Sequence, residues 1–472
     1  MTKEKSSLRA ALSITTEYNF SGSSKDGPYF FMKERLKAKE IAALVKEAGG
    51  STYYVGGCVR DRLMGIESKD IDVEVHGISI DVLEDILRNA GTPFTKGAGF
   101  GVFGLKGYEL DIAMPRKEEL TGKGHKDFRI DVDPYIGTLK ASERRDFTVN
   151  ALMEDVLTGE ITDHFGGQED LAKGILRHVS SSSFGEDPLR VLRAAQFAAR
   201  FSFDIAPETI ALCSKMNLSY LPAERIMGEL EKALLKAERP SVFFEMLRKM
   251  NQLDVWFPEI EKLIGVMQNP KYHPEGDVWN HTMLVLDEAA KLKDETSYPL
   301  GFMVTSLMHD AGKPETTTVD EDGRIRSIGH ELCLDTVRTA LKRFTNEARL
   351  IKYVLNMTKL HMRPNQLAYQ KSKQKAVNKL LDLAISPEDL ILFAKADHFG
   401  RTEYAPYDEV EKYLNDGLAS FNELMSKPYV TGQDLINAGL KPGVQFNELL
   451  KKAHDMRLAG IDKEIILKEI LK

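Results

Sequence analysis

Two aspartates at alternate positions, Asp70 and Asp72, open the first segment that could do chemistry. In Asp70–Val75 polar and apolar residues alternate as in a β-strand, and side chains two apart point to the same face of a strand. Asp111, in the short apolar segment Glu109–Ala113, supplies a third carboxylate. Convergent carboxylates repel one another unless a cation lies between them, and Mg²⁺ prefers such oxygen ligands. We therefore predict that Asp70, Asp72 and Asp111 are catalytic in phosphoryl transfer, with Mg²⁺ held by Asp70 and Asp72.

A pair of glycines follows the strand expected at residues 52–55. Gly56 and Gly57 have no side chains, so their backbone N–H groups could approach a triphosphate closely. Arg60 follows three residues later and adds positive charge. We predict that this turn binds the phosphates of a nucleotide.

The segments around these residues predict a small sheet. A helix is expected from about Met32 to Glu47, followed by short strands at 52–55, 70–75, 100–105 and 108–112. From about Leu171 onward the strand pattern fades, and amphipathic helical segments follow one another along the chain. We therefore predict an α+β fold, in which a small N-terminal α/β domain precedes a mostly α-helical remainder.

Composition restricts the class of protein. The chain has 472 residues, and since single cores rarely exceed roughly 250–300 residues, several domains are expected. Its three cysteines are odd in number and far apart, which argues against a disulfide framework or a thiolate zinc site. The sequence has neither a signal-peptide core nor a run of about 20 apolar residues, which favours a cytoplasmic protein without a membrane span. A net charge of −7 argues against indiscriminate coating of nucleic acid.

Five motifs occur in the order found in the nucleotidyltransferase superfamily, and together they resemble the bacterial and eukaryotic class of CCA-adding enzymes. The motifs are GGCVRDRLMG (56–65) with KDIDVEV (69–75), RRDFTVNA (144–151), DHFGG with DL (163–171), EDPLR with LR (186–193), and PAERI with EL (222–230). The resemblance implies a transferase that adds C, C and A from CTP and ATP to the 3′ end of tRNA and releases pyrophosphate. Its partners would be tRNA, ATP and CTP.

The resemblance also implies roles for individual residues. Asp70 and Asp72 would bind the catalytic metals, while Arg145 and Asp146 would contact the ribose and phosphates of the nucleotide. The implied nucleotide-binding set consists of Gly56, Gly57, Arg60, Arg145, Asp146, Asn150, Asp187, Arg190 and Arg193.

Within this set, Asp187 and Arg190 are implied to bind the Watson–Crick edge of the base. A carboxylate accepts from the exocyclic amine that CTP and ATP share, and a guanidinium donates to the adjacent ring nitrogen. UTP and GTP present the opposite polarity and would leave buried groups unpaired. On a helix these two residues, three positions apart, would share a face, although the same spacing also suits an ordinary ion pair.

Histidines and aspartates recur further along the chain in the order H…HD…D, which resembles the HD phosphohydrolase superfamily. Imidazole with carboxylate suits Mn²⁺, Ni²⁺, Fe²⁺ or Zn²⁺. The ligands implied by this resemblance are His281, His309, Asp310 and Asp397, with His330 and His361 for a second metal or the substrate phosphate. The implied reaction, with Ni²⁺, Mn²⁺ or a similar ion, is hydrolysis of phosphomonoesters or 2′,3′-cyclic phosphates. The alternative is a degenerate domain that only supports RNA binding.

Two further features bear on specificity. The polar stretch between Pro115 and Glu143, with Gly122 and Gly124, resembles the flexible loop that helps such enzymes switch from C to A, and it favours CCA or A addition over CC addition. Gln196 stands where the family usually has Arg, and we expect it to weaken a nearby phosphate or salt-bridge contact. The alternatives are an A-adding tRNA enzyme, a poly(A) polymerase, and a regulatory HD hydrolase whose N-terminal domain only binds nucleotide or RNA.

The predicted domains are a palm at 32–155, a helical neck and body at 156–265, an HD domain at 270–400 and an RNA-binding helical tail at 401–472. Between Lys342 and Lys379, ten Lys or Arg residues accompany one acid, with aromatic residues interleaved, a composition that suits a nucleic-acid backbone or a solvated helix face. The predicted RNA contacts are Arg225, Lys342, Arg343, Lys352 and Lys359.

Overall fold

The computed structural model describes residues 29–67, 70–96, 101–120 and 128–472, which form two compact units. The first unit comprises residues 29–119, 129–142 and 150–164, and the second comprises chiefly 143–149 and 165–472. Strands dominate the first and helices the second, which confirms the predicted α+β class. Gly122 and Gly124 of the predicted loop lie outside the described residues.

A seven-stranded mixed sheet forms the first unit, with strand order β3-β4-β5-β2-β1-β8-β9. The strands are β1 (Ser51–Val55), β2 (Ile71–His76), β3 (Pro93–Thr95), β4 (Val102–Leu105), β5 (Leu110–Ala113), β8 (Met153–Asp155) and β9 (Ile161–Thr162). Strands β2 and β5 run parallel, whereas the other neighbouring pairs run antiparallel. Parallel strands begin at the same edge of a sheet, so residues near the starts of β2 and β5 are neighbours.

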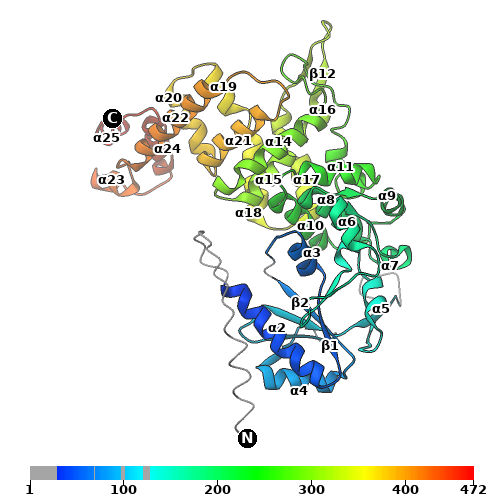
Figure 1. Ribbon diagram of the computed structural model, residues 1–472. Coiled ribbons are helices and arrows are strands. Elements are labelled where there is room, and N and C mark those ends of the chain that lie inside the picture. The colour runs from blue at the N-terminus through cyan, green and yellow to red at the C-terminus, as the bar shows by residue number, and fades with distance from the viewer. Residues whose placement is uncertain (1–28, 68–69, 97–100, 121–127) are drawn as a thin grey trace. The chain divides into compact units, whose positions relative to one another are not determined.

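Helices cover this sheet through their apolar faces. Helix α2 (Tyr29–Glu47) packs against β1, β2 and helix α4 (Ile80–Ala90), as Figure 1 shows. The shorter elements are α3 (Gly57–Leu63), α5 (Thr138–Glu143) and the 3-10 turn η1 (Thr148–Asn150). Strands β6 (Arg116–Leu120) and β7 (Phe128–Val132) pair with each other.

The second unit, in its described residues, is a succession of helices with two small strand pairs, β10-β11 and β12-β13, and two 3-10 turns between them. Its first elements are α6 (Gly167–Lys173), β10 (Ile175–Leu176), α7 (Ser181–Gly185), α8 (Leu189–Phe201), β11 (Asp204–Ile205), α9 (Pro207–Cys213), α10 (Ala223–Lys236), α11 (Ser241–Lys249), α12 (Leu253–Trp256) and α13 (Pro258–Glu261). Then come α14 (Val278–Leu292), η2 (Lys293–Glu295), α15 (Pro299–Met308), α16 (Lys313–Thr316), β12 (Thr317–Val319), β13 (Ile325–Ser327), η3 (His330–Leu332), α17 (Leu334–Phe344) and α18 (Ala348–Leu360). The last are α19 (Arg363–Tyr369), α20 (Gln374–Leu383), α21 (Pro387–Phe399), α22 (Asp408–Ser426), α23 (Gly432–Asn437), α24 (Gln445–Leu458) and α25 (Lys463–Ile470).

One hydrophobic core runs through most of this helical unit, from Phe147 to Leu458. A smaller cluster that includes Leu435, Ile466 and Ile470 holds α23, α24 and α25 together. The core is continuous across residues 265–270 and 400, so the finer domain boundaries expected there stay predictions.

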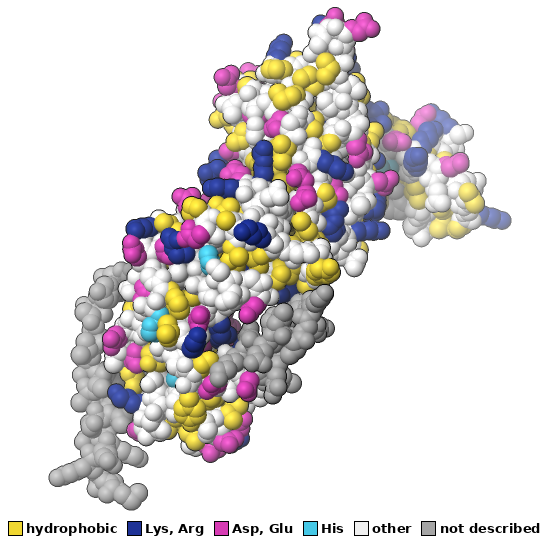
Figure 2. Space-filling model, turned by 90° about the vertical axis from the view of Figure 1, so that its right-hand side faces the viewer, with side chains coloured by type: hydrophobic (Ala, Val, Ile, Leu, Met, Phe, Trp, Pro, Cys, Tyr) yellow, Lys and Arg dark blue, Asp and Glu magenta, His cyan; other side chains and the backbone are white. Residues whose placement is uncertain are grey.

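The surface of the described residues is mixed in charge. On the face seen in Figure 2, basic and acidic side chains are interspersed with apolar ones. Among the described residues no helix is both long and apolar enough to cross a membrane.

Candidate functional site

Three carboxylates meet near the starts of β2 and β5. The parallel register pairs Asp72 with Asp111, and Asp70 directly precedes β2. Paired residues of neighbouring strands point to the same face, as do residues i and i+2 of one strand. Asp70 is exposed and Asp72 half-exposed, and the half-exposed Asp111 forms an ion pair with Lys96. The set therefore offers oxygen ligands at an accessible position, which fits a Mg²⁺ ion.

The glycine turn between β1 and α3 adopts a backbone that requires glycine. Gly56 has φ +73° and directly precedes α3, and at Gly57 an added Cβ would meet only Arg60, at 3.5 Å. The guanidinium of Arg60, expected to add charge for phosphates, is instead buried at 4% exposure. It donates to Asp61 Oδ1 and, over 2.5 Å, to Asn150 Oδ1. In the structure Arg60 therefore fixes Asn150 in place, and direct nucleotide contact by this pair stays a prediction.

The remaining nucleotide-binding candidates belong to the second unit. Asp146 is buried, and its Oδ2 lies 2.6 Å from Arg193 Nη2, while its Oδ1 accepts from the Phe147 backbone N–H. Burial lowers the pKa of Arg193, but Asp146 outweighs burial and raises it. This pair is a rigid support, and Arg145 next to it is partly exposed.

Asp187 and Arg190 do not form the ion pair that their spacing permits. Asp187 lies before α8 rather than on it, and it binds Arg225 of α10 over 3.0 Å. Arg190 donates to the backbone carbonyls of Ser183 and Arg144, each over 2.7 Å. Arg225, predicted as an RNA contact, is thus an anchor for Asp187 in the structure.

Gln196 lies on the core side of α8. Its side chain is 1% exposed, and its Nε2 makes no hydrogen bond. The expected weakening of a phosphate or salt-bridge contact by this residue stays a prediction.

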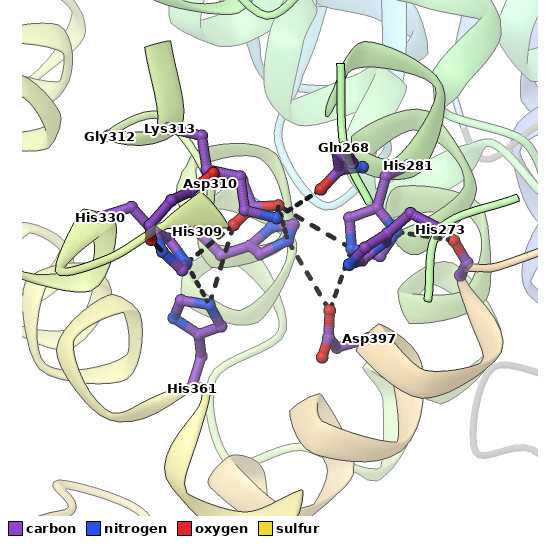
Figure 3. Close-up of polar contacts among 12 residues, drawn as sticks. Gln268, His273, His281, His309, Asp310, Gly312, Lys313, His330, His361 and Asp397 are labelled. Atoms are coloured by element: carbon purple, nitrogen blue, oxygen red, sulfur yellow. Dashed lines mark hydrogen bonds and ion pairs between the residues drawn. The ribbon is translucent and has the colours of Figure 1, made fainter. Parts of the chain in front are cut away.

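A second constellation lies entirely within the helical unit, where five segments bring four histidines and two aspartates together (Figure 3). His281 comes from α14, His309 and Asp310 follow α15, His330 opens η3, His361 follows α18, and Asp397 belongs to α21. All six are buried, with exposures of 0–7%. These are the six residues predicted for the HD site, and the structure gathers them.

The four rings share one tautomer because each Nδ1 faces a backbone carbonyl. The acceptors are Gly400 for His281 (3.0 Å), Ser306 for His309 (2.9 Å), Ser327 for His330 (2.7 Å) and Thr358 for His361 (2.6 Å). A carbonyl only accepts, so each Nδ1 carries the hydrogen. Every Nε2 is therefore directed into the cluster, and on a neutral ring this atom carries the lone pair that can bind a cation.

The Nε2 atoms form two groups that share Asp310. Asp310 Oδ2 lies 3.2 Å from His309 and 3.9 Å from His281, while its Oδ1 lies 3.2 Å from His330 and 3.9 Å from His361. Asp397 Oδ1 completes the first group, 3.1 Å from His281. Neither Asp310 oxygen, nor His309 Nε2, makes a hydrogen bond of normal geometry. Buried lone pairs facing buried carboxylates fit one or two transition-metal cations.

Electrostatics keeps the two carboxylates ionised. Burial alone would raise the pKa of Asp310, but His309 and Lys313 hold it well below its usual range. Burial would likewise raise the pKa of Asp397, and His281 outweighs it. Burial, with His309 and His330 nearby, lowers the pKa of His361 to about 3, so this ring stays neutral. Ionised carboxylates and a neutral imidazole are the forms that bind a metal.

The structure adds residues that the sequence analysis did not assign. Lys313 Nζ lies 2.6 Å from Asp310 Oδ2 and donates to Gln268 over 2.7 Å. Arg401 Nη2 lies 3.9 Å from Asp397 Oδ2, and Glu275 Oε1 lies 2.9 Å from His281 Nδ1. Burial would raise the pKa of Glu275, but hydrogen bonds from two histidines lower it to about 2. Proximity in sequence was the available signal, because Lys313 follows the His309-Asp310 pair and Glu275 precedes His281.

Two segments of the chain match known protein families. Residues 52–177 match the family described as the Poly A polymerase head domain, and residues 202–264 match the one described as a probable RNA and SrmB-binding site of polymerase A.

Two curated relatives carry the name Multifunctional CCA protein. That of Haemophilus ducreyi is 42% identical over 268 residues, 55% of this chain, and the chain spans 63% of that relative's length. That of Actinobacillus pleuropneumoniae is 35% identical over 362 residues, which are 74% of this chain and 85% of the relative.

Solved structures of CCA-adding enzymes share the fold. The Thermotoga maritima enzyme complexed with tRNA aligns with a TM-score of 0.62 at 23% identity, covering 94% of this chain and 95% of that one. A CCA-adding enzyme in complex with ATP aligns with a TM-score of 0.65 at 22% identity, covering 94% of each chain.

Proposed function

Because the chain belongs to the family of the multifunctional CCA proteins, we propose that it is a template-independent tRNA nucleotidyltransferase that adds C, C and A to the tRNA 3′ end. CTP and ATP are the nucleotide substrates, and pyrophosphate is released. The observation that carries the proposal is the register of Asp72 opposite Asp111 beside Asp70, within a chain that has all five motifs in order.

The carboxylates would act on the reacting groups. Asp70 and Asp72 would hold the divalent cation, which, when bound, lowers the pKa of the RNA 3′-hydroxyl and stabilises the leaving oxygen. Asp111 adds negative charge beside them, and its ion pair with Lys96 limits their mutual repulsion. Mg²⁺ is the ion that suits this set of oxygen ligands.

Base selection would rest on Asp187 and Arg190. Arg225 holds the Asp187 carboxylate from one side, and two backbone carbonyls hold Arg190. A carboxylate and a guanidinium with restricted positions favour the donor and acceptor pattern that CTP and ATP share.

RNA contacts would come from exposed lysines of the helical unit. Lys342, Lys352 and Lys359 are exposed, and Lys352 and Lys359 lie seven residues apart on α18, a helix without acidic residues. Arg343 is not free for RNA, because it binds both carboxylate oxygens of Glu259 at 2.8 and 2.7 Å. We therefore assign phosphate contact to the lysines and a structural role to Arg343.

The test uses three tRNA substrates that lack CCA, end in C or end in CC. Each is incubated with Mg²⁺ and with CTP, ATP, both, or UTP and GTP, and products are resolved at single-nucleotide length. We expect C, C and then A on the first substrate, followed by arrest. Addition of A to the CC end alone would instead indicate an A-adding enzyme, long A tails would indicate a poly(A) polymerase, and no extension would contradict the proposal.

We propose a second activity at the histidine cluster, a metal-dependent phosphohydrolase for phosphomonoesters or 2′,3′-cyclic phosphates. Two groups of convergent ligand atoms that share Asp310 support it, and both Asp310 oxygens and His309 Nε2 lack normal hydrogen bonds. Ni²⁺ or Mn²⁺ suits their chemistry. When bound, such a cation activates water and polarises the phosphate. Lys313 and Arg401 place positive charge beside the two aspartates, which favours an anionic substrate.

The hydrolase proposal is tested with the metal-free protein loaded with Ni²⁺, Mn²⁺ or Mg²⁺. Hydrolysis of p-nitrophenyl phosphate and of 2′,3′-cyclic AMP is then followed, and the bound metal is quantified. We expect transition metals to bind and restore hydrolysis. Bound metal without hydrolysis would support the alternative of a domain that has only a structural role in RNA binding.

A further inference from the structure

Glu275 lies behind the histidine cluster and joins two imidazole rings. Its Oε1 is 2.9 Å from His281 Nδ1 and 2.9 Å from His273 Nδ1, and its side chain is 1% exposed. The two rings meet edge to face with centroids 4.8 Å apart. Figure 3 shows His273 beside His281, on the side of His281 away from His330 and His361.

The turn that carries Glu275 is held firmly. The Glu275 carbonyl accepts from the Asn280 side chain over 3.0 Å. Asp277 caps α14 by accepting from the Asn280 backbone over 2.9 Å, and it also accepts from the Gly265 backbone over 2.8 Å. The carboxylate is therefore fixed relative to the first turn of α14, which carries His281.

The three atoms His273 Nδ1, Glu275 Oε1 and His281 Nδ1 are close enough to hold a cation themselves. The Gly400 carbonyl argues against that arrangement, because it lies 3.0 Å from His281 Nδ1 and can only accept. Nδ1 of His281 therefore carries a hydrogen, which Glu275 and Gly400 share. Nε2 of this ring faces the cluster, 3.1 Å from Asp397 Oδ1, and it carries the lone pair when the ring is neutral.

We propose that Glu275 is a positioning residue of the histidine cluster, one that holds His281 in the tautomer and orientation that present Nε2 to a cation. The proposal rests on the hydrolase function proposed above. Within the described part of the chain, His281 alone among the four histidines has a carboxylate within 3 Å of Nδ1. A carboxylate behind a metal-binding imidazole increases its basicity as a ligand and fixes its ring. Glu275 thus strengthens the group formed by His281, His309, Asp310 and Asp397 more than the group formed with His330 and His361.

The test measures metal affinity rather than turnover. Ni²⁺ is titrated by calorimetry into the metal-free full-length wild type and into Glu275→Gln, Glu275→Ala, His273→Gln and Asp389→Asn. Asp389 is the matched control, because it is also a buried carboxylate, on the same helix as Asp397, but binds Ser297 and Tyr353. We expect Kd to rise about 10–100-fold in Glu275→Ala and less in Glu275→Gln, which keeps an acceptor. Asp389→Asn and His273→Gln should stay within about twofold of the wild type, because neither residue belongs to the proposed support of His281.

Thermal melting of the metal-free variants separates positioning from folding. Glu275→Gln is nearly isosteric, so we expect its melting temperature to match the wild type while its metal affinity falls. Equal Kd values for the wild type and both Glu275 variants would overturn the inference and leave the hydrolase proposal intact. Loss of metal from His273→Gln as large as from Glu275→Ala would make these atoms ligands and also overturn it. A wild type that binds no transition metal would remove the hydrolase proposal and the inference together.

Discussion

The carboxylates of the sheet and the histidine cluster of the helical unit both suit divalent cations, but they are assembled differently. Asp70 and Asp72 are neighbours in one strand, and a single parallel pairing brings Asp111 beside them at an accessible edge. The histidine cluster draws buried residues from five segments, and His281 and Asp397 are 116 residues apart. Strand register can therefore position the ligands of an open site, whereas a buried site needs a packed core to orient each histidine ring.

The largest loss of activity is expected from a substitution in the carboxylates of the sheet, and it would show that the two sites act independently. Asp72→Ala should lower nucleotide addition by at least about a hundredfold, because a half-exposed ligand is lost without disturbing the core. Incorporation is measured on tRNA lacking CCA, and hydrolysis by the Ni²⁺-loaded variant serves as the control. Near-normal addition would contradict the assignment of Asp72.

The complementary change is made in the cluster. Asp310→Asn should remove most hydrolysis, a loss of about a hundredfold or more, because Asp310 faces both groups of histidines. Nucleotide addition should stay within about twofold of the wild type, since the transferase carboxylates belong to the other unit. Metal content and both activities are measured on one preparation. Loss of nucleotide addition in Asp310→Asn would contradict this expectation and show that the two sites are coupled.

A glycine substitution tests how tightly the cluster depends on packing. At Gly312 an added Cβ would lie 2.3 Å from the His330 carbonyl oxygen, so Gly312→Ala should destabilise the protein by about 1–3 kcal/mol and weaken metal binding. Gly228→Ala on α10 is the control, because no atom lies within 4 Å of its added Cβ, and alanine should stabilise that helix by about 0.5–1 kcal/mol. Urea unfolding measures both, and equal stability of the two variants would argue against the packing requirement.

The smallest effect is expected on the RNA surface. Combined Lys352→Glu and Lys359→Glu substitutions should weaken tRNA binding about threefold to tenfold at 0.1 M salt, with a shallower salt dependence, and leave addition at saturating tRNA unchanged. Lys291→Glu is the control for each single substitution, since Lys291 is exposed on α14 and pairs with Glu288. Filter binding over a range of salt concentrations gives both slopes. Equal loss in the control would indicate a general charge effect rather than a contact.

Local sequence patterns were enough for part of this protein. The alternation at Asp70–Val75 predicts a strand and a shared face for Asp70 and Asp72, because a strand repeats every two residues, and the structure has β2 from Ile71 to His76. The helical class of the second unit followed equally from apolar periodicity, and the order of histidines and aspartates predicted all six members of the cluster.

The tertiary structure determines which side chain each residue of the two sites contacts. The pairing of Asp187 with Arg225, of Arg343 with Glu259 and of Arg60 with Asn150 depends on how distant segments pack. Each pairing gives a partner within the protein to a residue that was expected to bind substrate. The tautomers of the four histidines depend on which carbonyl each ring meets, and Glu275 joined the cluster because the turn before α14 folds back against His281. The physical reason is that residue type sets which hydrogen bonds and ion pairs a side chain can make, while only the packed chain sets which ones it does make.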